Sequence, residues 1–319
     1  MRIGLCWNAG DDWIAHELRP SITKMSAEPA VNAPAWDVHR VARLRDDLDT
    51  RGFANCELVI DLRTVSVQDF LAHPLRGGPR ADVYEWFVDW VGEVVANAAG
   101  CVTDWELWGE AGCPYTGKGF VEADGRALYE GMTYVELLRR VYQRIHEVQP
   151  GARVLLGGHG CDMALRFYEQ VVEAGGGAHF DCNNLHPFVL RYRDWGAIEV
   201  MLREGFDRMR GLAVAAGVTP HPLVATEFGW PVRDGTAEVM FESHVLTHVV
   251  PVGEEQAAEW TQRCFELFEA QGMEYIILVQ AQIGLAGQHW GHALGVVGRT
   301  GQKRPALWNV VQDWMEKGR

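Results

Sequence analysis

The sequence predicts an α/β protein that folds as a (β/α)8, or TIM, barrel. Short apolar runs alternate with amphipathic segments of helical length, and this order is typical of a parallel sheet covered by helices. The 319 residues suffice for one such barrel with a substantial core. No linker, low-complexity tract or repeat divides the chain, so residues 1–319 are expected to form a single domain.

Strands and helices are expected from the periodicity of the apolar residues. The expected strands are Ile3–Trp7, Glu57–Leu62, Val102–Trp108, Arg153–Gly157, Phe180–His186, Leu223–Glu227 and Tyr275–Gln280. The expected helices are Trp36–Arg51, Val83–Ala98, Tyr134–Gln149, Ala164–Ala174, Ile198–Ala216, Glu254–Gln271 and Pro305–Lys317. Pro and Gly residues that follow several of these helices are typical stop signals.

A closed barrel needs one more strand, and that strand has to precede Val102. The segment Asp11–Pro34 is long, contains several prolines and is poorly periodic. A weak strand around Pro20–Met25 would complete the barrel. An irregular loop there would instead leave the N-terminal part of the barrel distorted or incomplete, and the sequence alone leaves both alternatives open.

Composition limits the class of partner. The 29 Lys and Arg residues stand against 43 Asp and Glu, so the net charge is −14 and a nucleic-acid partner is disfavoured. The 13 tryptophans fit a carbohydrate-binding cleft, because sugar rings pack on flat aromatic faces. A carbohydrate is therefore the expected ligand.

The expected location is the cytoplasm. The N-terminal residues lack the long apolar segment of a signal peptide, and no stretch is long enough to span a bilayer. The seven cysteines contain no C-x-x-C pair, which favours reduced thiols. No membrane partner is expected, export by another route stays open, and the oligomeric state is not predicted.

Two expected strands deliver a glutamate beside a tryptophan. Glu110 follows the strand that begins at Val102, and Glu227 ends the strand that begins at Leu223. Active sites of barrels gather at the C-terminal ends of the strands, so these two carboxylates are expected to converge. Retaining cleavage of a glycosidic bond needs two carboxyl groups about 5–5.5 Å apart. A helix cap or a surface ion pair is the alternative reading of each glutamate, and it is less favoured for the pair.

The motifs around these glutamates resemble those of clan A retaining glycoside hydrolases, particularly families 39 and 5. Trp105-Glu106-Leu107-Trp108-Gly109-Glu110 resembles the Trp-Glu-x-Trp-Asn-Glu end of their fourth strand, and Thr226-Glu227-Phe228-Gly229-Trp230-Pro231 resembles their seventh-strand nucleophile motif. Leu185-His186-Pro187-Phe188 is similar to their sixth-strand motif, and Lys303-Arg304-Pro305-Ala306-Leu307-Trp308 to the segment that opens their last helix.

The resemblance runs from about Val83 to Trp314 and implies a specific activity. It implies one glycoside-hydrolase-like barrel domain that cleaves an oligo- or polysaccharide by double displacement, without a cofactor. It assigns the acid/base role to Glu110 and the nucleophile role to Glu227. It does not identify the sugar, the linkage or the choice between endo and exo cleavage.

Gly109 is the main departure from this family, which has Asn at the corresponding position. In the family that Asn hydrogen-bonds the sugar 2-hydroxyl, a contact that strengthens in the transition state. Its absence implies another hydrogen-bond donor, a substrate without a free 2-hydroxyl, or a weakened enzyme.

Glu106 has a different expected role from Glu110. It lies four residues earlier on the same face of the strand, one layer deeper in the barrel, so it is expected to be a structural or supporting residue. A buried carboxylate needs a partner, and Arg63 at the end of the strand Glu57–Leu62 is the expected one.

Further residues near the expected strand ends are candidates for binding the substrate. His186 is weighed against a purely structural histidine, His159 is slightly favoured as a ligand because it lies in a loop, and Trp230 and Trp290 are the best candidates for sugar stacking. The full set is His186, His159, Arg63, Trp230, Trp290, Trp7 and Gln280.

Two other functions remain open from the sequence. A non-catalytic carbohydrate-binding protein on the same barrel is suggested by Gly109 and by the doubtful N-terminal strands. A metal-dependent hydrolase would use His289 and His292, but two histidines without an adjacent acidic ligand are a weak signal. No metal is therefore expected.

Overall fold

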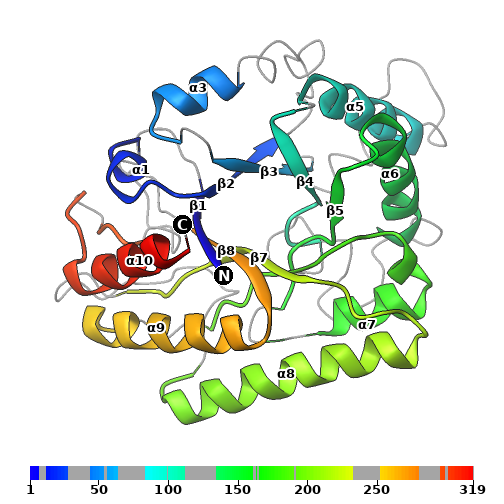
Figure 1. Ribbon diagram of the computed structural model, residues 1–319. Coiled ribbons are helices and arrows are strands. Elements are labelled where there is room, and N and C mark those ends of the chain that lie inside the picture. The colour runs from blue at the N-terminus through cyan, green and yellow to red at the C-terminus, as the bar shows by residue number, and fades with distance from the viewer. Residues whose placement is uncertain are drawn as a thin grey trace.

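The computed structural model describes residues 1–6, 12–27, 44–53, 56–63, 83–98, 100–111, 134–160, 163, 165–189, 192–232, 252–279, 295–298 and 301–318. Within these residues a parallel sheet of eight strands is surrounded by helices (Figure 1). The strands are β1 (Arg2–Cys6), β2 (Ile22–Ala27), β3 (Glu57–Leu62), β4 (Val102–Leu107), β5 (Arg153–Leu155), β6 (Asn183–Leu185), β7 (Leu223–Phe228) and β8 (Met273–Leu278).

The helices follow the strands in alternation. They are α1 (Asp12–Leu18), α3 (Leu44–Thr50), α5 (Val83–Ala98), α6 (Tyr134–Val148), α7 (Arg166–Glu173), α8 (Trp195–Ala215), α9 (Glu254–Ala270) and α10 (Pro305–Lys317), with a short 3-10 helix, η3, at Gly176–Ala178. Most of the expected elements recur within a few residues of their expected bounds, and α1 was not expected. Of the expected helix Trp36–Arg51, the structure describes only the part that contains α3. Among the described residues, no helix combines the length and apolar character needed to cross a membrane.

The sheet closes on itself, as a TIM barrel requires. The hydrogen-bonded order is β5-β4-β3-β2-β1-β8-β7-β6, and parallel bridges pair Leu155 with Cys182 and His159 with Leu185 across the remaining seam. The predicted fold class is therefore confirmed. The eighth strand is β2, which pairs in parallel with β1 and β3, so the N-terminal part of the barrel has its full set of strands.

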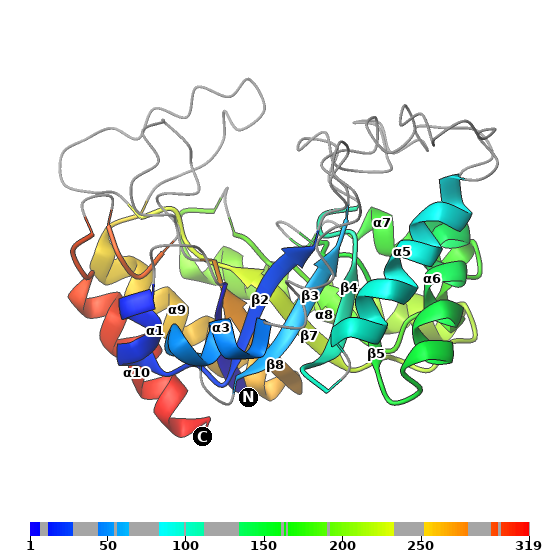
Figure 2. The same ribbon diagram turned by 90° about the horizontal axis from the view of Figure 1, so that it is seen from above.

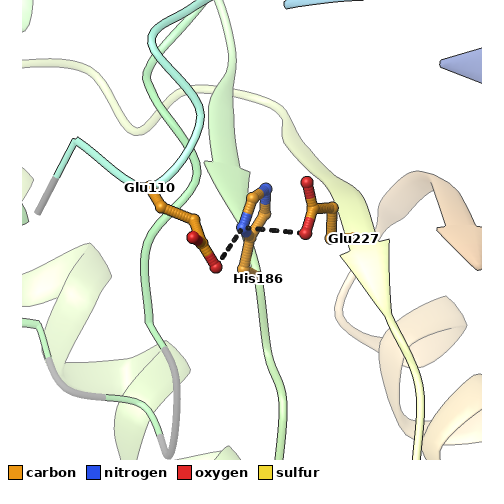
Figure 3. A group of neighbouring side chains, drawn as sticks. All are labelled: Glu110, His186 and Glu227. Carbon is orange, nitrogen blue, oxygen red and sulfur yellow. Dashed lines mark ion pairs between the residues drawn. The ribbon is translucent and has the colours of Figure 1, made fainter. Parts of the chain in front are cut away.

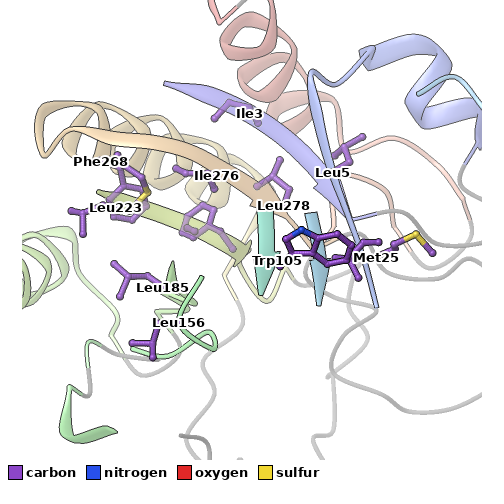
Figure 4. Packing of buried hydrophobic residues seen from close by; sticks show 14 of the residues in the cluster. Ile3, Leu5, Met25, Trp105, Leu156, Leu185, Leu223, Phe268, Ile276 and Leu278 are labelled. Carbon is purple, nitrogen blue, oxygen red and sulfur yellow. The ribbon is translucent and has the colours of Figure 1, made fainter. Parts of the chain in front are cut away.

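Alternation along the strands separates an apolar shell from the barrel interior. Outward-facing residues such as Ile3, Leu5 and Ile276 join the large core between the strands and the helices (Figure 4). A smaller apolar layer consists of Ile22, Val59, Leu155, Cys182, Val224, Tyr275 and Ile277. Side chains alternate along a strand, so a residue two positions after a member of this layer also faces the barrel interior. On several strands that residue is polar.

The polar end of the barrel is the end at which the strands finish. In Figure 2 the arrowheads of β2 and β3 point to one edge of the molecule, and both chain termini lie near the opposite edge. Two residues beyond Ile22, Val59 and Val224 come Lys24, Asp61 and Thr226, all of which are buried. A layer of buried polar groups thus lies above the apolar one, at the face where barrel enzymes carry their active sites.

Candidate active site

Glu110, His186 and Glu227 converge at the C-terminal ends of three strands. Glu227 belongs to β7, Glu110 lies in the turn after β4, and His186 directly follows β6. The His186 Nδ1 atom lies 3.8 Å from Glu110 Oε1 and 3.7 Å from Glu227 Oε2, so the imidazole lies between the two carboxylates (Figure 3). One carboxyl oxygen from each glutamate and one nitrogen of His186 all lie within 4.8 Å of one another.

A left-handed turn directs Glu110 into the site. Trp108 and Glu110 have φ angles of +63° and +62°, and a non-glycine residue in this region costs about 1–3 kcal/mol. Neighbouring contacts compensate for this backbone strain. Trp108 is fully buried, and its ring packs against Phe87. Its backbone N–H donates to Leu62 O at 3.0 Å. The turn closes with a bond of 3.0 Å from Ala111 N to Trp108 O. The acid/base candidate is therefore held by a strained but well-anchored backbone.

Asp61 explains why position 109 is glycine. The Gly109 N–H donates to Asp61 Oδ1 at 2.8 Å. A β-carbon at Gly109 would lie 2.6 Å from Asp61 Oδ2 and 3.2 Å from Glu106 Oε1, so a side chain there would displace the aspartate. Burial raises the pKa of Asp61, and Arg63, 3.4 Å away, opposes that rise. The carboxyl group of Asp61 thus occupies the space in which an asparagine side chain at 109 would begin.

Lys24, and not Arg63, is the cation that pairs with Glu106. Glu106 is 0% exposed, and its Oε2 atom lies 2.8 Å from Lys24 Nζ. The expectation for Arg63 is wrong in this respect, because Arg63 lies beyond the end of β3 and pairs with Asp61. The lysine comes from β2, the strand for which the sequence left an irregular loop as the alternative.

Glu106 is saturated with partners, which fits its expected supporting role. Besides the Lys24 ion pair, Oε2 accepts a hydrogen bond from Thr226 Oγ1 at 2.9 Å. The other oxygen, Oε1, accepts from Gly158 N at 3.0 Å and lies 3.5 Å from His186 Nε2. A buried carboxylate with this many donors keeps its charge, and although burial opposes ionisation, Lys24 and His186 hold the pKa of Glu106 below its ordinary value.

Lys24 also contacts the second catalytic candidate. Its Nζ atom lies 2.9 Å from Glu227 Oε1, so one buried ammonium group bridges Glu106 and Glu227. Burial disfavours the charged form of Glu227, but Lys24 and then His186 outweigh it and lower the pKa of Glu227 to about 2. Glu227 is therefore an anion throughout the neutral range.

His186 is positioned through its other ring nitrogen. The Nε2 atom lies 3.0 Å from Thr226 Oγ1, and the ring is 2% exposed. Gly158 allows this approach, because a β-carbon there would overlap the ring. Burial disfavours the imidazolium form, but Glu227, Glu106 and Glu110 raise the pKa of His186 to about 9. The residue is thus a cation at neutral pH, placed between two carboxylates.

Other expected ligands take different positions. His159 is buried, its Nε2 atom lies 2.8 Å from Asn183 Oδ1, and its ring stacks on Tyr168. Trp230 is 2% exposed and packs against Phe228 and Trp260, so the structure does not present its ring as an open surface. Trp7, Gln280, Trp290, His289 and His292 lie outside the described residues.

Three polar residues of the site were not predicted from the sequence. Lys24, Asp61 and Thr226 all lie on strands and face the interior. A signal was present in each case, since a polar side chain interrupts a run of buried neighbours within a strand. Nothing local in the sequence shows which carboxylate each of them contacts.

Comparison with known proteins supports the fold and goes no further. No protein-family profile and no curated protein matches the sequence. Solved structures do match. A family 39 glycoside hydrolase from Bacteroides cellulosilyticus WH2 aligns with a TM-score of 0.67 at 15% identity, over 98% of this chain and 63% of that chain. A GH10 protein from Paenibacillus barcinonensis aligns with a TM-score of 0.65 at 13% identity, over 97% of this chain and 94% of that one.

A fungal β-1,4-galactanase aligns similarly, with a TM-score of 0.64 at 12% identity over 98% and 99% of the two chains. The present chain thus spans under two thirds of the family 39 enzyme but nearly all of the other two. At these identities the likeness shows the fold alone, and the fold is the barrel of these glycoside hydrolases.

Proposed function

We propose that this chain is a retaining glycoside hydrolase that cleaves an oligo- or polysaccharide, with Glu227 as the nucleophile and Glu110 as the acid/base. The observation that carries this proposal is the approach of a Glu110 carboxyl oxygen to within 4.8 Å of a Glu227 carboxyl oxygen. Retaining enzymes hold their two carboxyl groups about 5–5.5 Å apart, whereas inverting enzymes leave about 6.5–9.5 Å for a water molecule.

The surroundings of the two glutamates support this division of roles. Glu227 contacts Lys24 and faces His186, and both cations keep it ionised and ready to attack. Glu110 lies at the rim, 19% exposed, with His186 as its charged neighbour and without the Lys24 contact. A residue that must alternate between acid and base suits the surroundings of Glu110 better than those of Glu227.

The reaction then proceeds in two displacements. A Glu227 oxygen bonds to the anomeric carbon while the glycosidic C–O bond breaks, and the Glu110 proton passes to the departing oxygen. The glycosyl group is now an ester of Glu227. Glu110, now ionised, takes a proton from water as the water oxygen bonds to the anomeric carbon and releases Glu227. His186 and Lys24 stabilise the carboxylate that leaves.

The test uses a panel of activated aryl glycosides. On these substrates Glu227→Gln is expected to lower kcat/KM by at least about 10²–10⁴-fold, because it removes the group that bonds to the anomeric carbon. Glu110→Gln should show a loss of that size with glycosides whose leaving group needs a proton, and with the activated glycosides it should mainly slow the second displacement and lower kcat. Glu199→Gln, which changes an exposed carboxylate paired with Arg203, is the matched control and should keep its activity. Hydrolysis that survives in Glu227→Gln would refute the assignment.

A 2-deoxy-2-fluoro glycoside with a good leaving group separates the two roles. The fluorine slows both displacements, so the glycosyl-enzyme should accumulate, and peptide mass spectrometry should find the added sugar on Glu227. NMR of the first product should show the anomeric configuration of the substrate. A wild-type chain that binds glycans but turns none over would instead be a carbohydrate-binding protein.

A further inference from the structure

The Nδ1 atom of His186 points into the space between the two carboxylates. Nδ1 is buried and has no hydrogen-bond partner among the described residues, although its ring is held on the opposite side by Thr226. A buried polar nitrogen that makes no direct hydrogen bond, and that faces two carboxylates only at ion-pair distance, is positioned to bind a ligand between them. Figure 3 shows that the nitrogen faces an oxygen of Glu110 and an oxygen of Glu227.

The three facing atoms form a set that suits a transition-metal ion. They are one imidazole nitrogen and two carboxylate oxygens, with 3.8 Å and 3.7 Å between the nitrogen and the oxygens. Zinc binds such atoms at about 2.0–2.2 Å, so two tetrahedral ligands of one ion lie roughly 3.3–3.6 Å apart. The two nitrogen–oxygen distances are close to that spacing, whereas the oxygens of the two glutamates, which lie within 4.8 Å of each other, would have to come closer. Both glutamate side chains are partly exposed at the rim.

The outer contacts also match those of a metal-binding histidine. Such a histidine commonly donates its second ring nitrogen to an oxygen acceptor, which fixes the ring and its tautomer. Here His186 Nε2 lies 3.0 Å from Thr226 Oγ1 and 3.5 Å from Glu106 Oε1. The two carboxylate oxygens of Glu227 also have separate contacts. Oε1 contacts Lys24, whereas Oε2 faces His186 and remains available to an ion.

We propose that Glu110, His186 and Glu227 form a binding site for a divalent transition-metal ion of the Zn²⁺ class, which occupies the site when no sugar is bound. The two carboxylates supply two negative charges against the two positive charges of the ion. Imidazole binds metal as the neutral base, so a proton leaves His186 for solvent as the ion enters. The bound ion would cover both proposed catalytic carboxylates and compete with the glycoside.

Metal binding can be measured without any substrate, so the result does not depend on the proposed hydrolysis. ZnCl₂ is titrated calorimetrically into the untagged full-length chain. The wild type should bind one Zn²⁺ that is lost on adding a chelator. Mg²⁺ should bind much more weakly, because it prefers all-oxygen sites and retains its water. In Co²⁺-loaded protein, the visible absorption band should report nitrogen and oxygen ligands.

Two site variants and one matched control test the ligands. His186→Gln and Glu110→Gln should each weaken Zn²⁺ binding at least tenfold, because each removes one of three ligands. Glu110→Gln changes a partly exposed residue and keeps the test valid if His186→Gln fails to fold. His146→Gln, which alters a histidine 3.1 Å from Asp181 on the outer side of the barrel, should bind Zn²⁺ like the wild type.

Three results would overturn the site. The first is a wild type that shows no saturable Zn²⁺ binding. The second is Zn²⁺ binding of unchanged affinity in both His186→Gln and Glu110→Gln, which would place the ion elsewhere. The third is Mg²⁺ binding as tight as that of Zn²⁺, since this would remove the need for a nitrogen ligand.

Discussion

The Nζ atom of Lys24 lies 2.9 Å from the Oε1 atom of Glu227, inside the barrel. The same nitrogen lies 2.8 Å from Glu106 Oε2, so the ammonium group joins the proposed nucleophile to the buried carboxylate beneath it. Burial opposes the charge on Lys24, but the two glutamates outweigh it and raise the pKa of the lysine above its ordinary value. The three charges therefore depend on one another for their ionisation.

Replacing Lys24 should change the ionisation of Glu227. In Lys24→Met the side chain stays unbranched but is one atom shorter and carries no charge, so the pKa of Glu227 should rise toward its ordinary range. A glutamate with a lowered pKa is active once the pH exceeds that pKa. The acidic limb of the kcat/KM profile should therefore move to higher pH, and the profile on an activated aryl glycoside measures the shift.

The exposed Lys317 provides the control for this prediction. Lys317→Met removes an ammonium group 2.8 Å from Glu269 at the surface and should leave the pH profile unchanged. Lys24→Met should also lower the free energy of unfolding by about 3–5 kcal/mol, because it leaves the buried carboxylate of Glu106 without its cation. A folded Lys24→Met protein with an unshifted acidic limb would show that Lys24 does not control the ionisation of Glu227.

His186 should make the stability of the protein fall at alkaline pH. Its pKa is about 9 in the folded protein and about 6.5 as a free side chain, so the folded state holds the proton more tightly. The stabilisation is complete below pH 6.5 and is lost as the pH rises through 9. It amounts to about 3 kcal/mol, and it should appear as a pH-dependent difference between the wild type and His186→Gln in urea unfolding.

His221 is the contrasting histidine for the same measurement. Burial lowers its pKa, so its folded-state pKa lies below the unfolded value and the sign reverses. The stability difference between the wild type and His221→Gln should increase as the pH rises through 6.5, because the unfolded chain then gives up its extra proton. If the His186 and His221 differences had the same slope, the assigned charge of His186 would be wrong.

The fold class and the convergence of Glu110 and Glu227 could be predicted from the sequence for physical reasons. Strands such as β3 and β7 are apolar runs with clear ends, and barrel geometry brings the residues at those ends together. β2 was uncertain because its interior carries Lys24, a residue that favours solvent unless it is paired. The carboxylates that pair with it come from β4 and β7, and no local pattern reveals such distant partners.

Aromatic residues near strand ends were harder to interpret than carboxylates. Trp230 lies just beyond β7, where a stacking surface was expected, yet its ring turns toward α9 and packs on Trp260. A tryptophan gains as much from burial against other rings as from a sugar, so its position in the sequence does not decide between the two. Arg63 was similarly ambiguous, because two buried acids lie within the reach of its strand end.

Gly109 should tolerate no side chain. In Gly109→Ala the new β-carbon would meet Asp61 Oδ2 at 2.6 Å, so either the aspartate or the turn must move. Overpacking of this kind costs about 1–3 kcal/mol of stability. A shift of about 1 Å at Glu110 should lower kcat about 10²-fold, because the proposed acid/base would no longer reach the glycosidic oxygen.

Gly151 is the matched control for Gly109, since a β-carbon there meets no atom within 4 Å. Gly151→Ala should change neither kcat nor the urea midpoint appreciably. Full activity and stability in Gly109→Ala would mean that Asp61 moves freely. The close approach of Asp61 to Gly109 would then not matter for function.

Glu106→Gln should separate support from catalysis. Glutamine keeps the shape of the side chain but removes the charge that faces Lys24 and His186, and breaking a buried ion pair in this way costs about 3–5 kcal/mol. The exposed Glu199–Arg203 pair provides the comparison, because surface pairs contribute only about 0–1 kcal/mol. Urea unfolding of Glu106→Gln and Glu199→Gln measures both effects. Because Glu106 holds the partners of the proposed nucleophile and would bond to no reacting atom, its loss should lower kcat less than the loss of Glu227. Equal stability of the two variants, or equal loss of kcat in Glu106→Gln and Glu227→Gln, would contradict this division.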